Sequence, residues 1–334
     1  MPSSLIVLII LALGFSFLNG IHDSANIVAT MISSRAMRPQ LALTMTAIAV
    51  FSGPFIFGIA VANTIGHEIV GAEHINIVVL IAALISAILW NVLTWILGIP
   101  SSSSHALIGG ILGAVVIAAG FQVIKIAGLL KILITLFISP VIGFVAGLIV
   151  ANIVYVLSWK ATPKINGIFK KLQIISALGP ALGMGSNDAP KTMGIIALGM
   201  LITGVTKTFT IPFWVILIGA TVISVGTAVG GWKLIRTLGS KFYKIRPIHG
   251  FAAQASAAIV ILTASLIGGP VSTTQVVSTA IMGVGAADRP SKVRWGVAGE
   301  ILSAWVFTIP ATALLAAGIY WLITVGIPNF SKLF

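Results

Sequence analysis

The chain has 334 residues, of which 58% are apolar and only 7% are charged, and its mean hydropathy is +1.14. A soluble domain carries about 25% charged residues, so this composition excludes a soluble enzyme and predicts an all-α polytopic membrane protein. The net charge of +13 does not indicate nucleic-acid binding, because the basic residues lie in short segments between apolar runs, where the positive-inside rule puts them.

The first long run, residues 1–36, is apolar except for a polar stretch, NGIHDSAN, at 19–26. The run at 172–206 is interrupted in the same way by GSNDAPKT at 185–192. Each run is too long for one membrane span and too short for two, since about 20 apolar residues cross a bilayer. The Gly and Pro residues in the polar stretches therefore predict two discontinuous helices.

The next apolar run, residues 39–66, precedes a loop at 67–74 that carries two Glu and no Lys or Arg. The corresponding loop in the second half, at 240–247, carries three basic residues. Because Lys and Arg stay on the cytoplasmic side, loops of opposite charge are expected on opposite sides of the membrane. The two halves are therefore predicted to be inverted repeats, the architecture of secondary transporters.

A third repeated pair consists of a Pro followed by a hydroxyl cluster, in GIPSSSSHALIGGILG at 98–113 and GGPVSTTQVVSTAIMG at 268–283. Pro suits the start of a helix, so both clusters are predicted to lie at helix N-termini. Free N–H groups and a partial positive charge at such an end bind oxyanions, and hydroxyls add uncharged donors. The alternative is that these side chains cap their own helices or join neighbouring helices.

The repeated segments occur in the same order in both halves and divide the chain into three parts. Residues 1–124 are predicted to be the first inverted repeat, residues 125–164 a linking transmembrane segment with a cytoplasmic loop, and residues 165–334 the second inverted repeat. The interrupted helices and the hydroxyl clusters are expected to meet near the middle of the bilayer.

Asp23 and Asp188 lie inside apolar runs, at corresponding positions of the two repeats. A carboxylate within the membrane is costly and is a functional hypothesis by default. The alternative for Asp188 is a local ion pair with Lys191, three residues further along a helix. An acid beside an oxyanion needs either a bound cation such as Na⁺ or a protonated oxyanion, and phosphate keeps a proton whereas sulfate does not. Both interpretations indicate symport of an anion with a cation.

These interpretations assign two sets of binding residues and no organic cofactor. The predicted phosphate ligands are Asn26, Ser102, Ser103, Ser104, Asn187, Lys191, Ser272, Thr273 and Thr274. The predicted Na⁺ ligands are Asp23, Asp188, His105, Gln275, Asn26 and Thr192. For Asn26 and Lys191, the alternative is that each only satisfies backbone groups at a helix break.

The adjacent Ser104 and His105 also suggest a Ser–His hydrolase. Neighbouring residues do not by themselves present a nucleophile to a base, and the second repeat has Gln275 in place of the histidine. We therefore expect His105 and Gln275 to supply polar contacts, and the chain not to be an enzyme.

Several segments resemble the inorganic phosphate transporter (Pit) family. The segment NGIHDSANIVATMISSRAM at 19–37 resembles the first signature of that family, GMGSNDAPKTMGI at 183–195 resembles the second, and PVSTTQ at 270–275 is similar to its P-V-S-T-T-H element. The resemblance implies phosphate uptake with Na⁺ or H⁺ by a homodimer built from inverted repeats. It also implies that Asp23 and Asp188 are essential acids and that the following residues contact substrate or ions: Asn26, Ser103, Ser104, Thr273 and Thr274.

The chain departs from the family pattern at His22, where the signature has Asn, and at Gln275, where it has His. These departures bear on the number of coupling ions and on the pH dependence of transport. Some relatives in the wider family carry sulfate instead of phosphate. The prediction is a multi-pass protein of the cell (inner) membrane that imports phosphate by Na⁺ symport, with alternating access around a midplane site. The alternatives are a transporter of the same fold that is coupled to H⁺, carries metal phosphate or carries sulfate, and, from another class, a passive anion channel.

Overall fold

A computed structural model of the chain describes residues 2–67, 75–162, 164–240 and 245–326. The regular secondary structure of these residues is helical, as the composition predicts. The loop segments 68–74 and 241–244, on which the predicted contrast in loop charge largely depends, lie outside the described residues.

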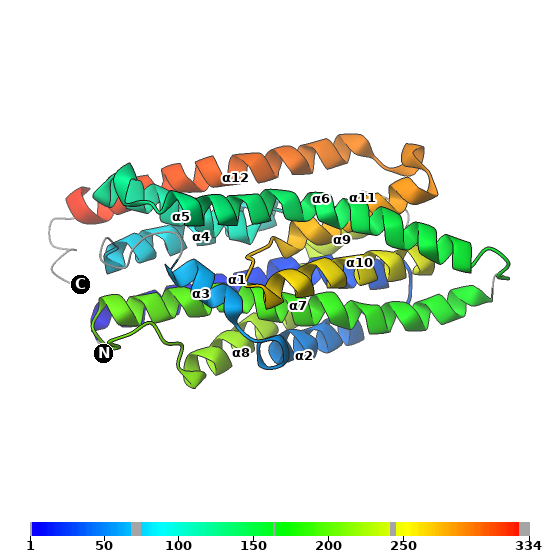
Figure 1. Cartoon of the computed structure of the whole chain (residues 1–334), viewed down its shortest axis with the longest axis horizontal. Helices are drawn as coiled ribbons and strands as arrows, with labels where there is room; N and C mark the ends of the chain where they lie inside the picture. The colour runs from blue at the N-terminus through cyan, green and yellow to red at the C-terminus, as the bar shows by residue number, and fades with distance from the viewer. Residues whose placement is uncertain (1, 68–74, 163, 241–244, 327–334) are drawn as a thin grey trace.

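In the part of the chain that the structure describes, six helices are followed by six more with a similar pattern of lengths, in which the first and sixth are long and the third is short (Figure 1). In chain order they are α1 (Ser3–Ser33), α2 (Pro39–Phe57), α3 (Ala60–His67), α4 (Ile77–Leu97), α5 (Ser103–Ala119), α6 (Ile126–Leu157), α7 (Ile165–Ile202), α8 (Phe213–Val229), α9 (Trp232–Ser240), α10 (Pro247–Leu266), α11 (Thr273–Asp288) and α12 (Trp295–Trp321). Short turns occupy matching places as well: η2 (Phe121–Val123) precedes α6, and η3 (Pro290–Lys292) precedes α12.

The packing of the helices repeats with the same symmetry. Helix α1 packs on α8 as α7 packs on α2, and α6 packs on α11 as α12 packs on α5. Helices α1 and α7 run in opposite directions, as do α6 and α12 (Figure 1). The predicted inverted repeat therefore agrees with the arrangement of the helices. The predicted boundaries, with residues 125–164 set apart as a link, stay a prediction, and α6 takes the place in the first half that α12 takes in the second.

Among the described residues, six helices are long and apolar enough to cross a membrane, and α8 with α9, which meet at 68°, makes a seventh candidate span. The chain is thus a multi-pass membrane protein. Helices α5 and α11 follow α4 and α10 after sharp turns and run back toward the end from which the chain came (Figure 1). Gly98 and Gly268 begin these turns with left-handed φ angles of +71°, which residues with a Cβ rarely adopt.

The prediction that helices break at 19–26 and 185–192 is wrong, because α1 and α7 are continuous through both stretches. A helix satisfies its own backbone groups in the membrane, so polar side chains do not require a break. The glycines in these stretches instead allow neighbouring helices to pack closely. Gly20 lies against the backbone of α8 and Gly185 against the backbone of α2. The breaks occur between α2 and α3, between α8 and α9, and at the two hairpin turns.

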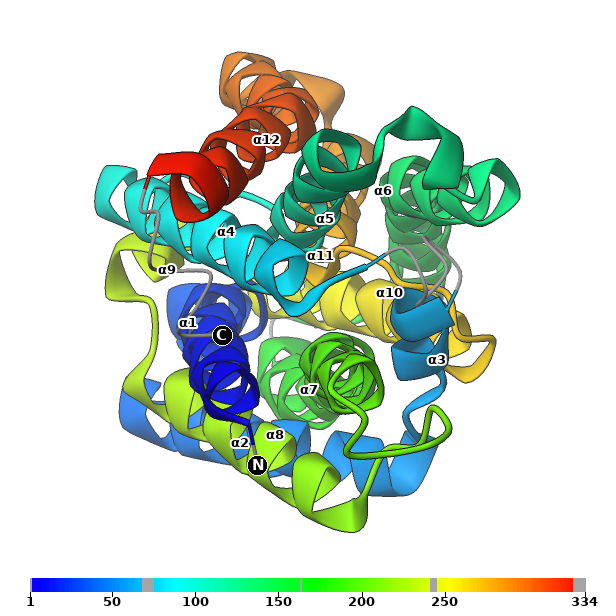
Figure 2. The ribbon, with the colours of Figure 1, turned by 90° about the vertical axis from the view of Figure 1, so that its left-hand side faces the viewer.

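Viewed along the helices, α1, α2, α7 and α8 lie on one side of the molecule and the other long helices lie on the opposite side, with α10 packed closely on α7 (Figure 2). We call α1, α2, α7 and α8 the core bundle, and α4, α5, α6, α10, α11 and α12 the hairpin bundle. The short helices α3 and α9 lie at the edges and bind the hairpin turns of the opposite half. Thr64 of α3 donates to the Gly268 carbonyl at 2.8 Å, and Thr237 of α9 donates to the Gly98 carbonyl at 3.2 Å.

The connections from α1 to α2, from α6 to α7 and from α11 to α12 lie at the same end of the molecule (Figure 1). These connections and the adjoining helix ends carry a concentration of basic residues, among them Arg35, Arg38, Lys160, Lys164 and Arg289. By the positive-inside rule this end is expected to face the cytoplasm.

Candidate functional site

The turns of the two hairpins meet each other beside the middle of α1 and α7. The Ser104 hydroxyl, in the first turn of α5, donates to the Val271 carbonyl of the other hairpin at 3.1 Å. Asp23 on α1 and Asp188 on α7 both bond to the first turn of α11. Both predicted acids and both hydroxyl clusters are therefore brought together, at the interface between the core bundle and the hairpin bundle.

Asp23 is held by neutral hydrogen-bond donors. Its Oδ1 atom accepts from the Thr274 hydroxyl at 2.6 Å and from the Asn26 amide at 2.9 Å. The Asn26 amide also lies 3.0 Å from the Thr274 hydroxyl oxygen. Two buried oxygens, Asp23 Oδ2 and Asn26 Oδ1, have no hydrogen-bond partner among the residues that the structure describes. Burying unpartnered polar oxygens is costly, so this pair is suited to a cation.

Asp188 is held by a charged donor. Its Oδ1 atom pairs with the Lys191 ammonium at 2.5 Å, and its Oδ2 atom accepts from the Thr273 hydroxyl at 2.9 Å. Lys191 Nζ also donates to the Ser104 hydroxyl oxygen at 2.6 Å and to the Val271 carbonyl at 2.8 Å. The local ion pair considered as the alternative for Asp188 is thus present. It does not isolate Asp188 from the site, because Lys191 contacts both hairpins as well.

Two of the predicted phosphate ligands cap their own helices. The Ser102 hydroxyl accepts from the backbone N–H of His105 at 3.2 Å, and the Ser272 hydroxyl accepts from that of Gln275 at 3.4 Å. This is the capping role that the sequence left open, and it keeps the first turns of α5 and α11 in shape. Ser103 is buried as the first residue of α5.

Residues that precede the acids reach the hairpins from the core bundle. Asn187 accepts from the Val271 N–H at 3.2 Å and donates to the Gly269 carbonyl at 3.0 Å, so it holds the backbone of the second hairpin turn. At the corresponding position in the first half, His22 Nε2 lies 2.7 Å from the Asn91 carbonyl oxygen of α4. Asn187 therefore positions the turn that carries the hydroxyl cluster.

His105 and Gln275 face each other across the approximate twofold axis, with 3.5 Å between Nδ1 and Nε2. His105 Nδ1 also lies 2.7 Å from the Ser102 hydroxyl, so the histidine pairs with Ser102 rather than with Ser104. Thr192 is buried, and its hydroxyl has no hydrogen-bond partner within the described residues. The roles of His105, Gln275 and Thr192 as sodium ligands stay predictions.

Two contributors to this region were missed in the sequence. The Val271 carbonyl accepts from Lys191 and Ser104, but a backbone acceptor leaves no sign in residue types. Asn91 is fully buried on α4, and neither the nitrogen nor the oxygen of its side-chain amide has a hydrogen-bond partner in the described ranges. A single amide within a strongly apolar helix was a signal that could have identified it.

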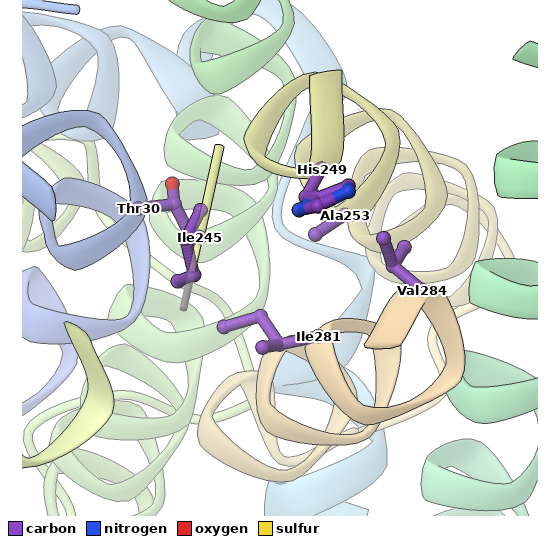
Figure 3. A pocket seen from close by; sticks show the side chains of 6 residues that line it. All are labelled: Thr30, Ile245, His249, Ala253, Ile281 and Val284. Atoms are coloured by element: carbon purple, nitrogen blue, oxygen red, sulfur yellow. The ribbon is translucent and has the colours of Figure 1, made fainter. Parts of the chain in front are cut away.

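The site is closed on all sides in this structure. Asp23, Asp188 and Lys191 are each only 1% exposed, and Thr273 and Thr274 are each 4% exposed. Toward the basic end, the inner turns of α1, α10 and α11, together with Ile245, border a narrow crevice that is too small to hold a water molecule (Figure 3). Its walls are lined by Thr30, Ile245, His249, Ala253, Ile281 and Val284. Mainly apolar side chains thus separate the site from that end of the molecule.

This arrangement can bind ions of both signs. The N-termini of α5 and α11 and the Lys191 ammonium group attract an oxyanion. Hydroxyls lie beside them on Ser103, Ser104, Thr273 and Thr274. Two carboxylates and an amide oxygen attract a hard cation, which prefers oxygen ligands. Among the described residues there is no cluster of three or more His, Asp or Glu side chains that could hold a transition metal. The site is suited to binding and releasing small ions.

Comparison with known proteins agrees with this chemistry. A model of the phosphate transporter family matches residues 19–316. The chain is 47% identical to a probable low-affinity inorganic phosphate transporter of Rhizobium meliloti (strain 1021), over 95% of this chain and 96% of that protein. It is 43% identical to the protein of the same name from Bacillus subtilis (strain 168), again over 95% and 96%.

The fold is also similar to a solved structure, described as a sodium-dependent phosphate transporter. The two chains superpose with a TM-score of 0.85 at 25% sequence identity, and the match covers 97% of this chain and 100% of the other.

Proposed function

Because the chain belongs to the phosphate transporter family, we propose that it imports inorganic phosphate together with Na⁺, with both ions bound between the core bundle and the hairpin bundle. The relatives are transporters, and the chain is likewise not an enzyme. Sodium coupling draws support from the similar solved structure and from the oxygen ligands of the site.

The observation that carries the proposal is that two oxygens, one of Asp23 and one of Asn26, lack a hydrogen-bond partner among the described residues. Within the described part of the chain, Asp23 Oδ2 and Asn26 Oδ1 are buried and accept no hydrogen bond, and both belong to α1, which contains no Lys or Arg. A sodium ion bound here neutralises the carboxylate and removes the repulsion between Asp23 and an incoming anion.

Phosphate is expected to bind at the first turns of α5 and α11. Ser103, Ser104, Thr273 and Thr274 supply hydroxyls there, while the backbone N–H groups of the two helix ends supply a partial positive charge. Lys191 adds a full positive charge beside them. Phosphate keeps a proton that it can donate to a carboxylate, and sulfate does not, so the acids favour phosphate.

Import of an anion into a cell works against the membrane potential, so a cation has to enter with it. Moving one charge across 100 mV involves about 2.3 kcal/mol, and an anion that enters an interior-negative cell alone works against this energy. Sodium that enters with the phosphate offsets it. A passive anion channel is disfavoured, since two buried carboxylates beside the path repel anions.

Movement of one bundle relative to the other is proposed to expose the site to each side in turn. The acids lie on the core bundle and the hydroxyls on the hairpin bundle, so the Asp23–Thr274 and Asp188–Thr273 contacts cross the sliding surface. An inverted repeat relates the outward-open and inward-open arrangements approximately by a twofold rotation about an axis in the membrane plane. The dimeric state and the cell (inner) membrane location implied by the resemblance are part of the same proposal.

The test is uptake of radioactive phosphate by liposomes that contain the purified chain, at one fixed pH, with an inward gradient of Na⁺ or of K⁺. The proposal expects uptake with Na⁺ and little with K⁺. Uptake that persists at full rate without Na⁺ and follows a pH gradient overturns it in favour of proton coupling. Unlabelled sulfate, added in excess, should not compete.

Counterflow separates a transporter from a channel. Liposomes preloaded with unlabelled phosphate should take up labelled phosphate faster than empty liposomes, because the loaded carrier returns more quickly. Flux that does not respond to phosphate on the opposite side identifies a channel and contradicts the proposal.

A further inference from the structure

The two halves of the site differ in the residue that follows each acid by one helical turn. Asn26 stands three residues after Asp23, and Lys191 stands three residues after Asp188, at corresponding positions of the repeat. Both side chains donate to the acid of their own helix. One half thus contains a neutral amide at the place where the other half contains a full positive charge.

The Lys191 ammonium lies in a cage of three oxygens. Its distances are 2.5 Å to a carboxylate oxygen of Asp188, 2.6 Å to the Ser104 hydroxyl and 2.8 Å to the Val271 carbonyl. An ammonium has three donors, and these three bonds use all of them. A carboxylate, a hydroxyl and a backbone carbonyl are also the kinds of oxygen that bind a hard cation. The Lys191 nitrogen therefore occupies the position that a bound cation would take next to Asp188.

The Asp23 half has the same kind of oxygens and no ammonium group. Asp23 Oδ2 and Asn26 Oδ1 are both buried and unpartnered. Thr274 adds a hydroxyl from the hairpin of the other half, just as Ser104 does at Lys191. This half offers unpaired oxygens to a cation, whereas the other half already holds an ammonium group.

The charges of the site follow from this difference. Two carboxylates and one ammonium leave a net charge of −1, which one sodium ion cancels. With a neutral residue at position 191 the net charge would be −2, and two sodium ions would be needed to cancel it. The lysine belongs to the chain and stays behind after each cycle, whereas sodium leaves with the phosphate.

We propose that the Lys191 ammonium takes the place of a second coupling cation, so that the chain binds one sodium ion per cycle, at Asp23 and Asn26. This inference rests on the proposed sodium symport and specifies its stoichiometry. With one sodium ion, import of monovalent phosphate moves no net charge in a complete cycle, and the phosphate gradient reached at equilibrium does not depend on the membrane potential. The residue at position 191 therefore determines how many sodium ions drive each transport cycle.

The experiment is equilibrium binding of radioactive ²²Na⁺ to the purified full chain in lipid nanodiscs. The expected stoichiometry is one sodium ion per chain for the wild type, none for Asp23→Asn, two for Lys191→Asn and one for the double variant. Lys207→Asn, which removes an exposed lysine, is the matched control and should keep one sodium ion. The Hill coefficient for Na⁺ in phosphate uptake should be about 1 for the wild type and should rise toward 2 in Lys191→Asn.

Two bound sodium ions in the wild type, or one that survives Asp23→Asn, overturn the inference about Lys191 and leave sodium symport standing. A single sodium ion in folded Lys191→Asn also overturns it. A wild-type chain that binds no sodium at all overturns the proposed function itself. The wild-type and Asp23→Asn counts decide the question even where Lys191→Asn does not fold.

Discussion

The Thr274 hydroxyl donates to Asp23 at 2.6 Å although the two residues are 251 positions apart in the chain. The bond joins the middle of α1 in the first half to the first turn of α11 in the second. Its counterpart, between Thr273 and Asp188, joins α11 to α7 at 2.9 Å. Both acids are therefore held by the same helix end, and this places their charges beside the expected phosphate site.

Replacement of Asp23 by Asn should remove nearly all phosphate uptake at the Na⁺ concentration that half-saturates the wild type. The substitution keeps the size of the side chain but removes the charge that attracts sodium. Interactions with a charged group contribute about 1.5–3 kcal/mol, which corresponds to a loss of about 10- to 100-fold in apparent Na⁺ affinity. The measurement is initial uptake by liposomes as a function of Na⁺ concentration. Glu300→Gln, which neutralises an exposed acid on α12, is the control and should behave as the wild type.

Replacement of Thr274 by Val should raise the KM for phosphate and for Na⁺ by about tenfold. Valine keeps the shape of the side chain but cannot donate to Asp23, and a hydrogen bond to a charged group is worth about 1.5–3 kcal/mol. Thr221→Val is the matched control, because that hydroxyl lies on an exposed face and bonds only within its own helix, to the Leu217 carbonyl. Equal kinetics for the two variants would remove Thr274 from the site.

Replacement of Gly185 by Ala should destabilise the protein. A Cβ at this position would overlap the Val50 backbone, so α2 and α7 would have to separate. Overpacking of this kind costs about 1–3 kcal/mol. In Gly14→Ala the new methyl group meets nothing within 4 Å, and stability should be unchanged or higher because Ala favours helix over Gly. Thermal unfolding in detergent compares the two, and a Tm for Gly185→Ala at or above that of Gly14→Ala contradicts the packing argument.

The orientation of the chain can be tested with single cysteines, because the protein has none of its own. Thr162 lies in the exposed connection from α6 to α7, and Thr208 lies in the exposed connection from α7 to α8, at the other end of α7. A maleimide that cannot cross membranes should label Thr208→Cys in intact cells and should label Thr162→Cys only after the cells are opened. The reverse pattern would mean that the basic end faces outward.

Much of the architecture could be predicted because it depends on local composition. The low charge content and the long apolar runs identify a membrane protein, since charged side chains are costly in lipid. The repeated Pro-hydroxyl segments place two helix N-termini at corresponding positions, because Pro and Ser act on the backbone of their immediate neighbours. Asp23 and Asp188 stand out for the same reason, as acids within apolar surroundings.

What only the tertiary structure decided depends on partners that are distant in the sequence. The polar stretches of α1 and α7 suggested breaks, but Gly20 and Gly185 serve close helix packing, and which backbone they pack on is set by the fold. Nothing near Lys191 in the chain indicates that Ser104 and Val271 will surround it. Sequence thus determined which residues are costly to bury, because that cost belongs to each side chain alone. The fold determined how each cost is offset, because a buried charge is stabilised by whatever the packing brings within hydrogen-bond distance.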